Sequence, residues 1–154
     1  MLKVNELSGG YDGKQIVKNM TFHVEKGKIL GILGPNGSGK STLLKMISGV
    51  LKPTRGEILI EDRPINSYDI KQLAKKMAVL PQLNASVFTN SVYDAVSLGR
   101  YPHQSGFFST WSKEDENLVQ RAMESTGVSH YRNQHLEFLS GGEQQRVFIA
   151  QALA

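Results

Sequence analysis

The chain has 154 residues, of which 40% are hydrophobic, 21% are charged and none is cysteine. This composition excludes low-complexity disorder and fibrous chains, and the absence of cysteine excludes a disulfide scaffold, a thiolate zinc site and a cysteine nucleophile. No apolar run approaches the roughly 18 residues of a membrane helix, and the N-terminus becomes polar too soon for a secretory signal, so we expect a soluble, cytosolic chain. The net charge of +4 favours anionic partners, but the 18 lysines and arginines are spread along the whole chain, so a solvated surface explains the charge.

The first part of the sequence predicts two strands, Leu2–Leu7 and Ile16–Val24, separated by glycine-containing turns. Residues Lys28–Leu33 form a short, nearly continuous apolar run, which is typical of a strand covered on both faces in a parallel sheet. A glycine-rich loop and a helix over Ser41–Ile47 follow, and Gly49 stands where a C-terminal cap is expected.

The next elements continue the alternation of strand and helix. Gly56–Glu61 is predicted to be a strand, Tyr68–Lys76 a helix with an apolar stripe, and Met77–Leu80 a second short apolar strand. Strand, loop and helix followed by strand, helix and strand indicate an α/β core with parallel pairing.

Beyond residue 83 the character of the sequence changes. Ser91–Leu98 is predicted to be helical, Gly99–Trp111 to be an aromatic and glycine-rich loop, and a longer helix is predicted from Ser112 to about Thr126. Ser112 and Asp115 have the spacing of a capping box. Residues 84–138 therefore read as a helical insertion, before a final helix that starts near residue 143.

One string matches the pattern G-x-x-x-x-G-K-[ST] of a phosphate-binding loop: Gly34, Pro35, Asn36, Gly37, Ser38, Gly39, Lys40 and Ser41. Glycines allow backbone N–H groups to converge on phosphate oxygens, and the following helix N-terminus favours an anion. Lys40 supplies a positive charge for the β- and γ-phosphates, and Ser41 a hydroxyl for Mg²⁺. The alternative, a glycine-rich surface turn beside a helix cap, does not account for the apolar run before the loop and the helix directly after it.

A second informative string is Leu139-Ser140-Gly141-Gly142-Glu143-Gln144-Gln145-Arg146. Ser140 and Glu143 have capping-box spacing, so a simple helix start is the alternative interpretation. Two glycines at a helix start cost backbone entropy, yet they leave its N–H groups uncovered, as anion binding requires.

These two strings together, with Gln82 at the end of a core strand between them, resemble the motifs of ABC-type ATPases over essentially the whole chain. The resemblance implies an α/β P-loop NTPase core with an N-terminal antiparallel β region and an inserted helical subdomain. It implies three parts: residues 1–83 as the core, 84–138 as the helical subdomain, and 139–154 as the signature motif and the start of the helix returning to the core. A P-loop kinase would share the first string but has no reason to carry the second.

The resemblance also implies the roles of single residues. Tyr11 is expected to stack on adenine, although a lone tyrosine on a loop is otherwise a half-buried structural residue. Gly34–Ser41 and Thr42 are expected to hold the phosphates of ATP and Mg²⁺, and Gln82 to reach the metal or the attacking water. Ser140, Gly141 and Gly142 are expected to meet the γ-phosphate bound by the opposite chain of a head-to-tail pair.

A narrower resemblance lies in Leu98–Gln104, followed by Ser112–Glu116, which is similar to the ATPases of iron-siderophore, haem and cobalamin importers. It implies a peripheral subunit on the cytoplasmic side of the cell membrane, attached through transmembrane permease subunits and without direct contact to nucleic acid. The alternative is a soluble ABC-type ATPase that acts on nucleic acid or the ribosome.

Family domains are longer than 154 residues, so we expect this chain to be the N-terminal part of one, ending before the Walker B strand. The Asp, Glu and His that the family places on later segments are not among the 154 residues. We therefore expect the intact protein to be a translocating ATPase, and this chain to bind Mg·ATP but to hydrolyse it slowly, since general-base help contributes about 10²–10⁴-fold. We also expect low stability, because a parallel edge is left without its neighbouring strand.

Overall fold

The computed structural model describes residues 1–80, 91–104 and 111–154. The chain divides into two compact units, Met1–Leu73 (unit 1) and Ala74–Ala154 (unit 2), and each unit is described by itself. The predicted boundary between residues 83 and 84 lies outside the described residues and stays a prediction.

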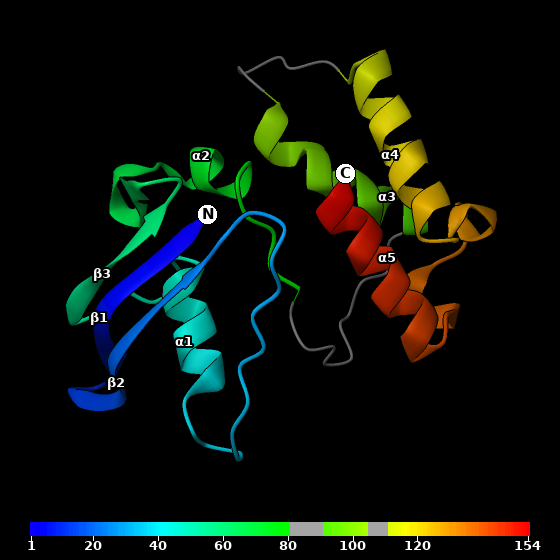
Figure 1. Ribbon diagram of the computed structural model, residues 1–154. Coiled ribbons are helices and arrows are strands. Elements are labelled where there is room, and N and C mark those ends of the chain that lie inside the picture. Colours follow the sequence, from blue (N-terminus) through cyan, green and yellow to red (C-terminus); the bar gives the residue numbers. More distant parts are fainter. Residues whose placement is uncertain (81–90, 105–110) are drawn as a thin grey trace. The chain divides into compact units, whose positions relative to one another are not determined.

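Unit 1 is built on an antiparallel sheet with strand order β2-β1-β3-β4 (Figure 1). Asp12 and Gly13 join β1 to β2, and both have positive φ angles of 50° and 76°, as a two-residue hairpin turn of type I′ requires. This arrangement confirms the predicted antiparallel β region at the N-terminus. The strands are β1 (Leu2–Tyr11), β2 (Lys14–Val24), β3 (Arg55–Ile60) and β4 (Arg63–Pro64).

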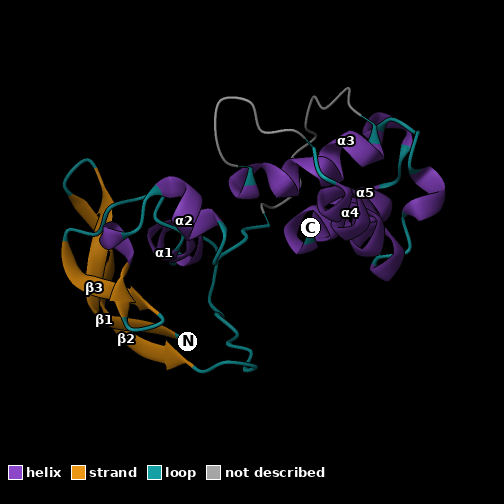
Figure 2. Cartoon of the chain, turned by 90° about the horizontal axis from the view of Figure 1, so that it is seen from above, coloured by secondary structure: helices purple, strands orange, loops and turns teal. Residues whose placement is uncertain are grey.

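Helix α1 (Lys40–Ile47) lies against one face of this sheet (Figure 2). Its buried side includes Met46, and a Cβ added at Gly9 of β1 would lie only 2.6 Å from the Met46 sulfur. Glycine in the strand therefore permits the close approach of helix and sheet. The helix ends before Gly49, whose φ of 75° confirms the predicted C-terminal cap. A 3₁₀ turn, η1 (Ile65–Ser67), follows the sheet, and a short helix, α2 (Ile70–Ala74), runs across the boundary to the next unit.

Two predicted strands are wrong. Residues Lys28–Leu33 have no regular secondary structure, and the side chains of Ile29 and Leu33 are 98% and 95% exposed. Met77–Leu80 likewise forms no strand. The physical reason is that a parallel strand is held by neighbours on both sides, and the sheet of the described residues is entirely antiparallel and pairs with neither segment.

Unit 2 is helical in its described part, apart from an isolated antiparallel bridge between Ser91 and His135. This confirms the helical character predicted for the described portion of residues 84–138. The elements are α3 (Val92–Ser97), η2 (Leu98–His103), α4 (Lys113–Ser125), η3 (Ser129–Tyr131), η4 (Leu136–Phe138) and α5 (Gly141–Leu153). Helices α3, α4 and α5 pack on a common apolar core formed by Val92, Ala95, Val96, Val119, Ala122, Met123, Val128, Leu136, Leu139, Val147 and Ala150.

Polar contacts at the helix ends fix this unit. Ser112 and Asp115 form the predicted capping box at α4. Arg100 donates from Nε to Asp115 Oδ1 at 2.9 Å and from a terminal nitrogen to the Ala154 carbonyl at 2.7 Å, so it ties η2 to both α4 and α5. The hydroxyl of Ser112 and the guanidinium of Arg100 hold the pKa of Asp115 at about 2. Among the described helices, none combines the length and the apolar character that crossing a membrane requires.

Candidate functional site

The glycine-rich loop leads directly into α1, and its glycines are needed for its shape. Gly37 and Gly39 have φ angles of 81° and 93°, which only glycine adopts without strain. A Cβ added at Gly34 would lie 2.8 Å from the Ser38 hydroxyl oxygen. A Cβ at Gly39 would lie 3.1 Å from a methyl group of Ile16, so the end of the loop packs against β2. The loop is therefore a compact turn fastened to the sheet.

The start of α1 has the properties of an anion site. Gly39 caps the helix without a side-chain hydrogen bond, and the first turn contains no acidic residue. The first N–H groups of α1 are thus not covered by a side chain, and they lie at the positive end of the helix dipole. Lys40 Nζ donates to the carbonyl oxygens of Gly34 and Pro35, at 2.7 and 2.8 Å, which brings its ammonium group across the loop. This set of donors and positive charge fits a phosphate group.

The two hydroxyl residues after Lys40 differ in exposure. Ser41 is exposed in the first turn of α1, where its oxygen is accessible to a metal ion. Thr42 is buried, so the group that it could offer to an anion is its backbone N–H, one of the first four of the helix.

Tyr11 lies at the end of β1 and is 39% exposed. The ammonium of Lys45 on α1 lies 5.6 Å from the centre of its ring, at cation–π distance. The predicted adenine-stacking residue is therefore linked to the helix that follows the phosphate loop. Sequence reasoning missed Lys45, because no sequence spacing relates a strand end to one face of a helix 34 positions later.

Gln82, the predicted metal and water ligand, lies outside the described residues. Within the described part of the chain, no three His, Asp or Glu residues come together as a metal site would require. Of the metal ligands predicted here, the structure thus describes Ser41 alone.

The second string forms the N-terminus of α5 in unit 2. Ser140 is the N-cap, and a Cβ added at Gly141 or Gly142 would meet no atom within 4 Å. The two glycines therefore leave the surface of this helix tip bare, as the sequence predicts for a site that meets an anion. The Ser140 hydroxyl donates to Glu143 Oε2 at 2.7 Å and accepts from the Glu143 N–H at 3.4 Å, so the capping-box interpretation is also correct.

Glu143 has a further partner that sequence reasoning missed. The hydroxyl of Tyr131 on η3 donates to Glu143 Oε1. The hydrogen bonds from Tyr131 and Ser140 hold the pKa of Glu143 at about 2. The hydrogen bond between Tyr131 and Glu143 also raises the pKa of Tyr131. The two residues are 12 positions apart and in different elements, so no local pattern could have indicated the pair.

The predicted site residues thus fall into two groups. Unit 1 holds Tyr11, the phosphate loop, Ser41 and Thr42, and unit 2 holds Ser140, Gly141 and Gly142. Each group contains the N-terminus of one helix, α1 or α5, whereas Tyr11 is linked through Lys45 to the last turn of α1.

Comparison with known proteins gives a consistent result. The family described as "ABC transporter" matches residues 17–154. The chain is 47% identical over 153 residues to the uncharacterized ABC transporter ATP-binding protein YvrA of Bacillus subtilis, covering 99% of this chain and 35% of that protein. It is 40% identical to the iron(3+)-hydroxamate import ATP-binding protein FhuC of the same organism, covering 99% of this chain and 56% of the relative. The chain therefore spans about half the length, or less, of these curated relatives.

The solved structures that this chain resembles are also ABC transporter proteins. A putative metal-chelate type ABC transporter in an inward-facing conformation matches with a TM-score of 0.80 and 31% identity, over 98% of this chain and 54% of that one. The dimeric structure of a bacterial ABC transporter cassette matches with a TM-score of 0.82 and 28% identity, over 100% of this chain and 69% of that one. These matches confirm the predicted α/β fold class, and with the family match over nearly all residues they show that the chain belongs to the ABC transporter family.

Proposed function

We propose that this chain is the ATP-binding part of an ABC importer, which couples ATP binding and hydrolysis to the uptake of an iron-siderophore-type metal chelate. The observation that carries the proposal is the phosphate loop: an uncapped helix start, two glycines with positive φ, and a lysine ammonium lying across the loop. All three are features that a triphosphate requires and that a surface turn does not.

In this proposal each residue has a defined task. Backbone N–H groups of residues 37–42 bind the β- and γ-phosphates, Lys40 adds positive charge, and Tyr11 stacks on the adenine. Ser41 and Gln82 hold Mg²⁺, which neutralises phosphate charge when it is bound. Ser140, Gly141 and Gly142 of a second copy contact the γ-phosphate and complete the site.

The hydrolytic activity is proposed for the intact protein. The 154-residue chain on its own binds Mg·ATP and hydrolyses it slowly, because the residues that the resemblance assigns to water activation are not among its 154 residues. Turnover by the pure chain at about 1 s⁻¹ or faster would contradict this proposal.

The proposed cargo and partners follow from the relatives and from one string of the sequence. FhuC carries iron(3+)-hydroxamate import in its name, and a relative from Escherichia coli, FepC, carries ferric enterobactin transport. Residues Leu98–Gln104 are similar to the corresponding part of such importers. The partners are then transmembrane permease subunits and a second ATPase subunit. The protein is placed on the cytoplasmic face of the membrane through the permease.

The alternative function is an ABC-type ATPase that acts on nucleic acid or the ribosome. Co-purification of the tagged protein with a multi-span permease supports the importer. A salt-dependent complex with RNA or DNA supports the alternative.

Isothermal titration of the folded chain with Mg·ATP tests the nucleotide site directly. Lys40→Ala is expected to weaken binding roughly tenfold to a hundredfold, because a hydrogen bond to a charged group contributes about 1.5–3 kcal/mol. Lys52→Ala is the matched control, since Lys52 is an exposed lysine of the same unit outside the loop, and it is expected to leave the affinity unchanged. A folded sample that binds no Mg·ATP, or an unchanged affinity for Lys40→Ala, contradicts the proposal.

A further inference from the structure

At the tip of α5 the Glu143 carboxylate sits between two hydroxyl groups. Its Oε2 accepts from the backbone N–H and the hydroxyl of Ser140, both at 2.7 Å. Its other oxygen, Oε1, accepts from the Tyr131 hydroxyl. A negative charge therefore stands at the place where the proposed function requires Ser140 to meet a phosphate.

The Tyr131 hydroxyl is held firmly in this position. The Tyr131 ring packs against the apolar core of unit 2 and against His130, with ring centres 3.8 Å apart. Its backbone N–H donates to Val128, a fully buried member of that core, at 3.0 Å. The hydroxyl is thus a fixed donor on the scaffold of the unit, independent of the helix tip that it contacts.

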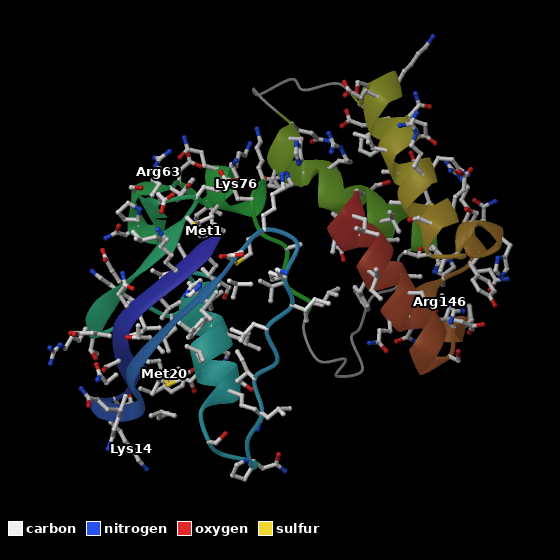
Figure 3. All side chains as sticks on the ribbon, in the orientation of Figure 1. Met1, Lys14, Met20, Arg63, Lys76 and Arg146 are labelled. Carbon is white, nitrogen blue, oxygen red and sulfur yellow. The ribbon has the colours of Figure 1, made fainter. Side chains whose placement is uncertain are left out.

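The turn that leads into the tip is also fixed. Gln144 Nε2 donates to the carbonyl oxygens of Leu136 and Leu139, at 2.9 and 3.1 Å. Arg146, labelled in Figure 3, lies on α5 three positions after Glu143, and its positive charge contributes to the low pKa of that carboxyl group. The backbone before the tip is therefore pinned, and the Ser140 and Glu143 side chains are the groups that exchange partners.

Ser140 cannot donate its single hydroxyl proton to Glu143 and to a phosphate at the same time. When Ser140 turns to a phosphate, Glu143 loses one donor, and its carboxylate is repelled by the incoming anion. The Ser140 backbone N–H on Oε2 and the Tyr131 hydroxyl on Oε1 then remain, and of these two the Tyr131 hydroxyl is the donor that comes from outside the helix tip.

We propose that Tyr131 is a positioning residue for nucleotide-driven pairing, which retains the Glu143 carboxylate while Ser140 exchanges it for the γ-phosphate of the opposite chain. This inference rests on the proposed function. Without the Tyr131 hydroxyl, the carboxylate keeps only the donors of Ser140 itself, so it competes with the phosphate for the Ser140 hydroxyl and weakens the closed pair.

The test uses the full-length protein and measures Mg·ATP-dependent self-association by sedimentation, together with KM and kcat for ATP. Tyr131→Phe is expected to weaken self-association roughly fivefold to tenfold and to raise KM more than it lowers kcat. Glu143→Gln removes the repelled charge, so in that background Tyr131→Phe is expected to have little further effect. The coupling between the two substitutions is the signature that a purely structural role would not give.

Tyr93→Phe is the matched control. Tyr93 is also partly buried in unit 2 and its hydroxyl also donates to a helix glutamate, Glu116, but on α4 instead of at the signature tip. It is expected to leave self-association unchanged.

Three results overturn the inference: unchanged association in Tyr131→Phe, an equal loss in the Glu143→Gln background, or an equal loss in Tyr93→Phe. These are distinguishable from failure of the proposed function. If the parent protein binds no Mg·ATP, the proposed function falls and the inference falls with it. If the parent binds and pairs normally but Tyr131 makes no difference, the inference alone is overturned.

Discussion

The two units of this chain differ in how they bury apolar surface. In its described part, unit 2 encloses a continuous core of eleven side chains, and each of the three main helices described there starts with a complete capping box. Unit 1 has a well-paired antiparallel sheet, yet it leaves Ile29 and Leu33 almost fully exposed beside the phosphate loop. Strands, turns and helices that are stabilised by contacts within one unit are present in each unit. The apolar segment Lys28–Leu33 pairs with no described strand, and it does not adopt a strand itself.

The largest expected change in the free energy of unfolding comes from a substitution in the core of unit 2. Met123 is fully buried, so Met123→Ala is expected to lower the free energy of unfolding by about 2–5 kcal/mol. Leu33→Ala, in the exposed segment of unit 1, is expected to change it by less than about 0.5 kcal/mol. Urea denaturation followed by circular dichroism measures both, and equal losses for the two variants would contradict the contrast between the units.

A smaller effect, on how stability depends on pH, is expected from the carboxylates of unit 2. Donors lower the pKa values of Asp115, Glu116 and Glu143 to about 2 each, foremost Ser112, Tyr93 and Tyr131, respectively. Folded values below the unfolded ones mean that this stabilisation is complete above about pH 4.5 and is lost as the pH falls toward 2.

Unfolding midpoints measured between pH 7 and pH 2 test this dependence. Asp115→Asn is expected to lower stability at pH 7 and to make the decline below pH 4.5 shallower. An unchanged decline would show that the Asp115 carboxylate, with its Ser112 and Arg100 partners, does not contribute to it.

The smallest effect concerns a single helix cap. Ser91 caps α3 through its hydroxyl, which accepts from the Asp94 N–H at 3.2 Å. Ser91→Ala is expected to cost about 1 kcal/mol, whereas Ser91→Gly costs only a few tenths, because glycine also suits the N-cap conformation. Thermal unfolding resolves the two, and a loss in Ser91→Gly as large as that in Ser91→Ala would indicate that the lost hydroxyl sets the cost and that the N-cap conformation of the backbone does not.

The sequence was informative wherever a few neighbouring residues decide the structure. The Asp12-Gly13 turn, the Gly49 cap and the capping boxes of Ser112 and Ser140 all follow from local chemistry, and all are present. The glycine-rich turn before α1 was predictable for the same reason, since its glycines, lysine and serine are contiguous, and its binding of phosphate stays a prediction.

What could not be predicted depends on contacts between distant segments. The prediction of a strand at Lys28–Leu33 was wrong because a strand needs neighbouring strands to pair with. The residues of the segment itself do not show whether such neighbours are in place. The contact of Lys45 with Tyr11 and that of Tyr131 with Glu143 join different elements, so they leave no trace in spacing or periodicity. Such contacts can be identified only in the folded structure.

The ammonium group of Lys40 is hydrogen-bonded to the backbone of its own loop. Two carbonyl oxygens accept from this ammonium, so the loop is already organised while the positive charge stays uncompensated. In the proposed function, a triphosphate that binds here replaces these two carbonyl acceptors with more negative oxygen atoms and does not have to order the loop. Selectivity at this point therefore depends on the density of negative charge that a molecule presents, and a weakly charged anion gains little by displacing those carbonyls.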